Sequence, residues 1–308
     1  MVVQHNLTAM NSNRMLGLTT KTQAKSTEKL SSGYKINRAA DDAAGLAISE
    51  KMRRQIRGLT QASLNAQDGI SAVQTAEGAL NEVQDMLQRM NELAVKGENG
   101  TLTTQDRSYI ASEVSQLMSE IDRVKETTTF NEQSLLNGKF DKALQVGAES
   151  NDENKIQVEI GNLAVSNLAK AADASIQKKG IKGMDTAAKV ASFFGNFNVA
   201  KAKAEETGKV YDITSSQFGA LNIWAKSALK DISQTRSDLG AIQNRLEHTI
   251  NNLDNVVENT TSAESQIRDT DMATEMVKYS NNNILAQAGQ AMLAQSNQAN
   301  QGVLSLLG

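Results

Sequence analysis

The most regular pattern of apolar side chains runs through residues 52–94. Apolar residues recur there every seven positions, and a second apolar series lies three or four positions further along each repeat. A period of 3.5 residues held over this length is typical of a long helix in a left-handed coiled coil. At about 1.5 Å per residue, the helix would span about 60 Å. The sevenfold series consists of Met52, Leu59, Ala66, Val73, Leu80, Leu87 and Ala94.

The C-terminal half carries a second long helix with the same period, and a shorter helix lies between the two. The segment "GENGTLTTQ" (97–105) ends the first helix with two glycines and a threonine-rich cap. The shorter helix that follows has an apolar face made of Ile110, Val114, Leu117, Ile121 and Val124. The sevenfold spacing then returns at Ile232, Leu239, Leu246, Leu253, Thr260 and Ile267.

Thinner apolar stripes occupy both ends of the chain. The N-terminal stripe consists of Val3, Leu7, Met10, Met15 and Leu18, before "KLSSGYKINRAADDAAG" (29–45) interrupts the pattern. The C-terminal stripe consists of Leu285, Met292, Ala299 and Leu306, with Val303 beside them. Ile267 and Leu285 are separated by two heptads plus four residues, so we expect the supercoil to unwind locally near 268–276.

The middle of the chain has a different pattern of apolar and polar residues. Within "ALQVGAESNDENKIQVEI" (143–160), two short alternating apolar runs flank a polar turn, which predicts a β-hairpin. Residues 161–211 are the least regular and are typical of an insertion at a loop tip. Phe193, Phe194 and Phe197 predict a small local core there rather than a ligand site.

These patterns predict a mainly α fold. Both chain ends would form a long antiparallel coiled-coil or helical-bundle rod, with a small β-hairpin region and a short variable segment at the tip. The expected parts are a terminal helix over 1–42, longer helices with the hairpin over 43–160, the variable segment over 161–213, a long helix over 214–267 and a second terminal helix over 268–308.

Composition narrows the possible functions. The 32 basic and 35 acidic residues give a net charge of −3, without the basic surplus of a nucleic-acid-binding protein. No run of 18 apolar residues is present, so we expect no membrane span, and the start lacks the pattern of a Sec signal. The chain has no cysteine and no proline. The absence of proline suits long helices, or a chain that must refold without slow isomerisation.

No catalytic or metal-binding constellation stands out, so we expect no enzymatic activity and no cofactor. His5 and His248 lie on opposite arms of the chain without neighbours at metal-ligand spacing. Asp41 and Asp42 precede a helix, where capping explains an aspartate better than paired acids do.

The terminal helices contain few large apolar side chains for the number of residues they would order. Because ordering a residue costs free energy that such sparse burial does not return, we expect both ends to be disordered in the isolated subunit. They should become ordered when they pair with each other and pack against other copies, and contacts that do not close on themselves build a helical filament. The predicted assembly residues are Leu7, Met10, Leu18, Leu285, Met292, Val303 and Leu306.

Several long segments resemble the signatures of bacterial flagellin. On the N-terminal side they are "EKLSSGYKINRAADDAAGLAISEKMR" (28–53), "GLTQASLNAQDGISAVQTAEGALNEVQDMLQRMNELAV" (58–95) and "SEIDRV" (119–124). On the C-terminal side they are "LGAIQNRLEHTINNL" (239–253), "AESQIRDTDMATEM" (263–276) and "NNILAQAGQAMLAQSNQANQGVLSLLG" (282–308).

The resemblance implies a structural subunit of the motility filament, with paired terminal helices as an inner core and longer helices as an outer core. It implies export through the flagellar apparatus, without a Sec signal peptide, to an extracellular filament. The implied partners are other copies of the chain, a chaperone that covers the C-terminal helix before export, and the filament cap and hook-junction proteins.

The resemblance also implies recognition by Toll-like receptor 5. The family's receptor-contacting residues map onto Arg89 and Leu93 in "LQRMNELAV", and onto Glu113. Met90 and Asn91 depart from the Val and Arg of the family motif, which puts the strength of recognition in doubt. Leu93 and Glu113 can also be ordinary helix-surface residues that serve contacts between subunits.

Two other functions fit parts of the sequence. A hook–filament junction protein shares the plan of terminal helices, but it should not grow long filaments from seeds. A soluble coiled-coil adaptor would have stable, protected terminal helices as a monomer.

Overall fold

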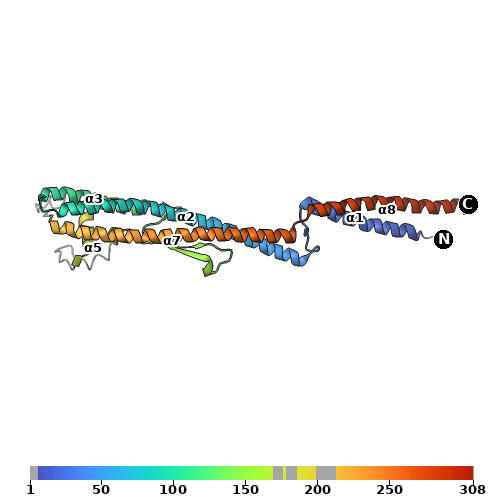
Figure 1. The fold of residues 1–308 in the computed structure, drawn as a ribbon, viewed down its shortest axis with the longest axis horizontal. Helices are drawn as coiled ribbons and strands as arrows, with labels where there is room; N and C mark the ends of the chain where they lie inside the picture. The colour runs from blue at the N-terminus through green and yellow to red at the C-terminus, as the bar shows by residue number, and fades with distance from the viewer. Residues whose placement is uncertain (1–5, 169–175, 178–185, 199–212, 308) are drawn as a thin grey trace. The chain divides into compact units, whose positions relative to one another are not determined.

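The computed structural model describes residues 6–168, 176–177, 186–198 and 213–307 (Figure 1). These residues are mainly helical, as predicted, and the helices are α1 (Leu7–Ser32), α2 (Ala43–Glu98), α3 (Thr104–Thr127), α5 (Ala187–Gly195), α7 (Ser215–Arg268) and α8 (Met272–Leu307). The chain divides into two compact units. Met1–Arg57 with Asn255–Gly308 form the first, and Gly58–Asp254 form the second. The finer division into five parts remains a prediction.

In the second unit, α2, α3 and α7 pack around an apolar core. The predicted sevenfold series supplies much of this core, because its members from Ala66 to Ala94 on α2 are fully buried. α7 contributes Ile232, Leu239 and Leu246 from its own series. The 3.5-residue period is therefore confirmed as the buried seam of a helical bundle.

The predicted β-hairpin is confirmed. Strands β3 (Asp141–Gln145) and β4 (Lys155–Glu159) pair antiparallel, with Leu144 opposite Ile156. Ile156 packs with Val146 and with residues of α2 and α7, so one face of the hairpin is buried on the bundle. A shorter antiparallel pair, β1 (Thr129–Phe130) with β2 (Gln133–Ser134), precedes it.

The phenylalanine cluster packs in a core, as predicted, and this core is larger than the small local one expected. Phe194 and Phe197 are fully buried, and the Phe194 ring lies 5.5 Å from that of Phe218 at the start of α7. Phe193 meets Phe194 edge to face at 5.0 Å. The cluster therefore belongs to the bundle core, because α5 packs against α3 and brings the rings inward.

Helix ends carry the expected capping residues. Thr103 starts α3 with a capping box: its hydroxyl accepts from the Asp106 amide at 3.2 Å, and the Thr103 amide donates to the Asp106 carboxylate at 3.0 Å. Asp42 accepts from the Gly45 amide at 2.9 Å within the first turn of α2, which confirms its capping role. Asp41 instead accepts from the Arg38 amide at 3.1 Å.

The predicted stutter near 268–276 is a full interruption of the helix, rather than a local unwinding. α7 ends at Arg268 and α8 begins at Met272, where Asp271 accepts from the Ala273 amide at 3.0 Å. The break is held by the C-cap residue of α1, because the Thr270 amide donates to the Gly33 carbonyl at 2.9 Å. A break between two helices is therefore favoured over a continuous helix at this stutter.

Candidate assembly surface on the terminal helices

α1 and α8 form an antiparallel pair within the first unit (Figure 1). Asn6 is hydrogen-bonded to Ser296, and Ser26 to Glu275, which fixes their opposite directions. The structure thus confirms that the two terminal regions pair. The expected disorder of both ends in an isolated subunit stays a prediction.

We call the buried and half-buried positions between these helices the terminal seam. On both helices they alternate in steps of three and four residues, the spacing of a coiled coil. On α1 the seam consists of Ala9, Ser12, Leu16, Thr19, Gln23, Ser26 and Leu30. On α8 it consists of Glu275, Tyr279, Asn282, Ala286, Gly289, Leu293 and Ser296. Most of these side chains are small or polar, so the helices approach closely while burying little apolar surface.

A polar contact closes the terminal seam at one end. The Ser26 hydroxyl donates to a Glu275 carboxylate oxygen at 2.7 Å, and Lys278 lies 3.3 Å from the other oxygen. The Glu275 residue is only 6% exposed. The Ser26 hydrogen bond, with a smaller contribution from Lys278, holds the pKa of Glu275 below its usual range despite the opposing effect of burial. The seam is thus built for an ionised carboxylate.

Acid should loosen this helix pair. Since the folded-state pKa of Glu275 is lowered, its contribution to stability is complete above the unfolded pKa of about 4.3, and is lost as pH falls through the folded pKa. Spin labels on cysteines introduced at the exposed residues Thr20 and Gln287 would follow the separation of the helices by electron resonance. We expect the distance distribution to broaden as the pH falls below about 4.3.

The Glu275→Gln variant is the control for this acid response. The neutral amide keeps the size of the side chain but does not titrate, so the part of the broadening that depends on Glu275 should disappear. A distance distribution that responds to acid equally in both proteins would contradict the assignment.

Large apolar side chains lie on the outside of the terminal helices. More than half of the surface of Leu7, Met10, Leu18, Leu285 and Met292 is exposed, at 54–70%. We define the outer apolar face as the exposed large apolar residues Leu7, Met10, Met15, Leu18, Met272, Met276, Val277, Ile284, Leu285 and Met292. Val303 and Leu306 lie on α8, but their side chains are outside the described part.

Leu285 and Met292 of the C-terminal stripe are exposed and lie outside the contact with α1, so their role in assembly with other copies stays a prediction. The contact with α1 belongs instead to the next residues along, Ala286 and Leu293, and to Gly289. A Cβ atom added at Gly289 would lie 3.4 Å from Leu16 of α1, so a small residue suits this crossing. The missed signal is the sevenfold repeat of small and polar residues that includes Glu275 and ends at Ser296.

The residues mapped to the receptor lie on the α2–α3 face of the second unit. Arg89 and Glu113 are exposed and joined by an ion pair of 2.9 Å, and Arg89 also contacts Glu92 at 3.1 Å. The pKa of Arg89 is raised chiefly by its hydrogen bonds to Glu113.

The expected surface position of Leu93 is wrong, because this side chain is 3% exposed and packs in the bundle core. Among the departures from the family motif, Met90 is buried, and the Asn91 side-chain oxygen is buried without a hydrogen-bond partner.

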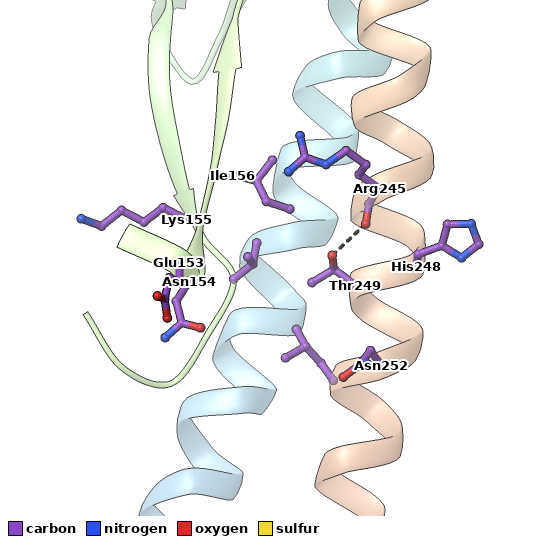
Figure 2. Close-up of a pocket in the computed structure, with 10 residues that line it drawn as sticks. Glu153, Asn154, Lys155, Ile156, Arg245, His248, Thr249 and Asn252 are labelled. Carbon is purple, nitrogen blue, oxygen red and sulfur yellow. Dashed lines mark hydrogen bonds between the residues drawn. The ribbon is translucent and has the colours of Figure 1, made fainter. Parts of the chain in front are cut away.

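A groove of about 510 Å³ lies between the β3–β4 hairpin and α7 (Figure 2). Glu153 and Lys155 border it from the hairpin, and Arg245 and His248 from α7. His248 points away from the hairpin in this view and is exposed, as predicted for a solvated helix face. Over the described residues, no group of three or more His, Asp or Glu side chains is placed to hold a metal ion.

No described helix is long and apolar enough to cross a membrane. His5 lies outside the described residues.

The fold places the chain among coiled-coil structural proteins. Its long helices have buried seams with a 3.5-residue period, and the large apolar residues of its terminal helix pair face outward.

Comparison with known proteins defines the family. The model of the bacterial flagellin N-terminal helical region matches residues 3–141, and that of the C-terminal helical region matches residues 224–307. The chain is 48% identical over 308 residues to a flagellin of Halalkalibacterium halodurans, with 100% of each chain covered. It is 46% identical over 310 residues to the flagellar filament 31.3 kDa core protein of Treponema maltophilum, and 45% identical over 312 residues to a flagellin of Bacillus subtilis, each with full coverage of both chains. The chain belongs to the bacterial flagellin family.

Proposed function

We propose that this chain is the structural subunit of a bacterial flagellar filament and polymerises through the outer apolar face of α1 and α8. The observation that carries the proposal is where the large apolar residues lie. In most helix pairs these residues face the partner helix, and here they do not. Small and polar residues fill the terminal seam, while Leu285, Met292 and their neighbours face outward. Large exposed apolar surfaces mark sites of protein association. Copies that associate through non-closing contacts form a filament, which suits a motility structure.

Growth from seeds tests this function. Purified chain added to short filament fragments should extend them into long filaments visible by negative-stain electron microscopy. A chain lacking residues 285–308 should not extend them, because it loses most of α8, yet its α2 bundle should keep its helical circular dichroism. Filaments grown from the shortened chain would refute the proposed role of α8, and failure of the full chain to elongate seeds would favour a junction protein.

The outer apolar face also supports the proposed route and partners. An exposed apolar helix risks premature association, so we infer that an export chaperone covers α8 in the cell before the flagellar apparatus exports the chain. The assembled subunit would be extracellular, with other copies, the filament cap and the hook-junction proteins as its neighbours.

We further propose that the second unit is a ligand of Toll-like receptor 5 through Arg89 and Glu113. The supporting observation is that both side chains are exposed and preorganised by their mutual ion pair. Leu93 would act as a positioning residue, because its burial in the core fixes the helix face that presents Arg89.

The Arg89→Ala variant should weaken receptor binding by about tenfold or more, the usual effect of removing a central arginine from an interface. Surface plasmon resonance with the receptor ectodomain would measure this loss. Arg123→Ala is a matched control, since Arg123 is exposed on α3 and paired with Glu120 in a similar way. Equal loss in both variants would count against the mapped site, and a Leu93→Ala variant would be judged only after its unfolding free energy is measured.

A further inference from the structure

The methionines of the described residues differ in exposure, and Met52 and Met86 are half-buried. Five of them are exposed, and all five lie on α1 and α8 within the first unit: Met10, Met15, Met272, Met276 and Met292. Their exposed fractions are 49–65%. Met90 and Met118, on α2 and α3 of the second unit, are at most 1% exposed. The molecule therefore contains exposed methionines together with buried methionines that serve as internal controls.

The exposed methionines make up half of the outer apolar face, five of its ten residues. A thioether is soft and apolar, and methionine is common on surfaces that bind other helices. Oxidation to the sulfoxide makes the same side chain polar and disrupts methionine-rich interfaces. Oxidation of the sulfur atoms would thus turn much of the outer apolar face polar, without changing the residues of the terminal seam.

We propose that peroxides oxidise these five methionines in the unassembled subunit and thereby block its addition to a filament, whereas assembled subunits are protected. In each step the sulfur lone pair attacks one oxygen of hydrogen peroxide. A sulfur–oxygen bond forms, the oxygen–oxygen bond breaks, and the leaving hydroxide takes the proton of the oxygen now bound to sulfur, which gives water and the sulfoxide. The sulfur is oxidised by two electrons and the peroxide is reduced. This inference rests on the proposed assembly through the outer apolar face.

Peptide mass spectrometry tests the reactivity. Purified subunits treated with hydrogen peroxide should gain oxygen at the five exposed methionines before Met90 or Met118 changes. The same sites in preassembled filaments, treated and then dissociated, should oxidise more slowly by about tenfold, since burial in an interface removes access to the oxidant. Equal rates at exposed and buried methionines, or in subunits and filaments, would overturn the proposal.

Seeded growth tests the consequence. Oxidised subunits should elongate seeds at least about tenfold more slowly than untreated subunits, and methionine sulfoxide reductases A and B should restore the rate. A variant with leucine at all five positions keeps apolar side chains of similar volume and should elongate seeds equally with or without peroxide. Replacement of only the α1 pair or only the α8 trio gives a second test, with partial protection expected.

The outcomes separate this inference from the proposed function. Untreated chain that fails to extend seeds would refute the function itself, and the assembly step of this inference with it. Untreated chain that grows, together with oxidised chain that grows equally well, would overturn the inference alone. Loss of growth that the reductases do not reverse would also overturn it, because the damage would then lie elsewhere.

Discussion

Replacement of Leu285 and Met292 by aspartate should abolish growth of the chain on filament seeds. Both side chains are more than half exposed in the subunit, so the double substitution should leave the α1–α8 pair formed. In an assembled filament it would remove about 1.5–3 kcal/mol of apolar burial at each position and would add an unpaired charge to an apolar contact. We expect the elongation rate, followed by light scattering and electron microscopy, to fall more than about a hundredfold.

A matched variant controls for charge. Gln287→Asp with Gln298→Asp adds the same two charges to α8 at exposed positions that are already polar. This variant should retain most of the growth rate, because it removes no part of the outer apolar face. Growth of the Leu285 and Met292 variant at the rate of the native chain would show that this face is not the assembly surface.

The Phe194→Ala variant should cause the largest loss of stability in the second unit. Phe194 comes from the segment that the sequence marked as an insertion, yet its ring is fully buried between Phe193 and Phe218. Removing a buried phenylalanine leaves a cavity and typically costs about 3–5 kcal/mol. Urea unfolding of the full chain, followed by circular dichroism and by the fluorescence of buried Trp224, would measure the change.

The neighbouring Phe193→Ala substitution gives the comparison within the same turn of α5. Phe193 is only partly buried, so its loss should cost clearly less free energy of unfolding. If Phe194→Ala costs no more free energy of unfolding than Phe193→Ala, the burial of Phe194 contributes little, and α5 is a peripheral element. That result would favour a small local core, as the sequence alone predicted.

Much of the fold follows from local patterns in the sequence. The sevenfold series on α2 and α7 predicted the bundle seam, because bulky residues from Val73 to Leu87 have no other way to leave water. The alternation around residues 143–160 predicted the hairpin for the same reason. Local patterns were sufficient where burial is apolar and its partners lie within the same subunit.

Local patterns did not predict which side of each terminal helix contacts the other helix. In an isolated pair the apolar stripe normally marks the contact between the helices, but Leu285 and Met292 lie outside that contact. The structure gives the contact to small and polar residues such as Gly289 and Ser26, which periodic hydrophobicity does not detect. Leu93 was misplaced for a related reason, since a motif identifies a residue without giving its burial.

Hydrogen exchange of the same chain as free subunits and as filaments tests the central claim most directly. If the outer apolar face is the assembly surface, the amides of α1 and α8 should gain the largest protection on assembly. Amides of residues 73–94, in the buried part of α2, should change little because the bundle already protects them. Terminal helices as strongly protected in the free subunit as in the filament, or a gain confined to the bundle, would contradict assembly through α1 and α8.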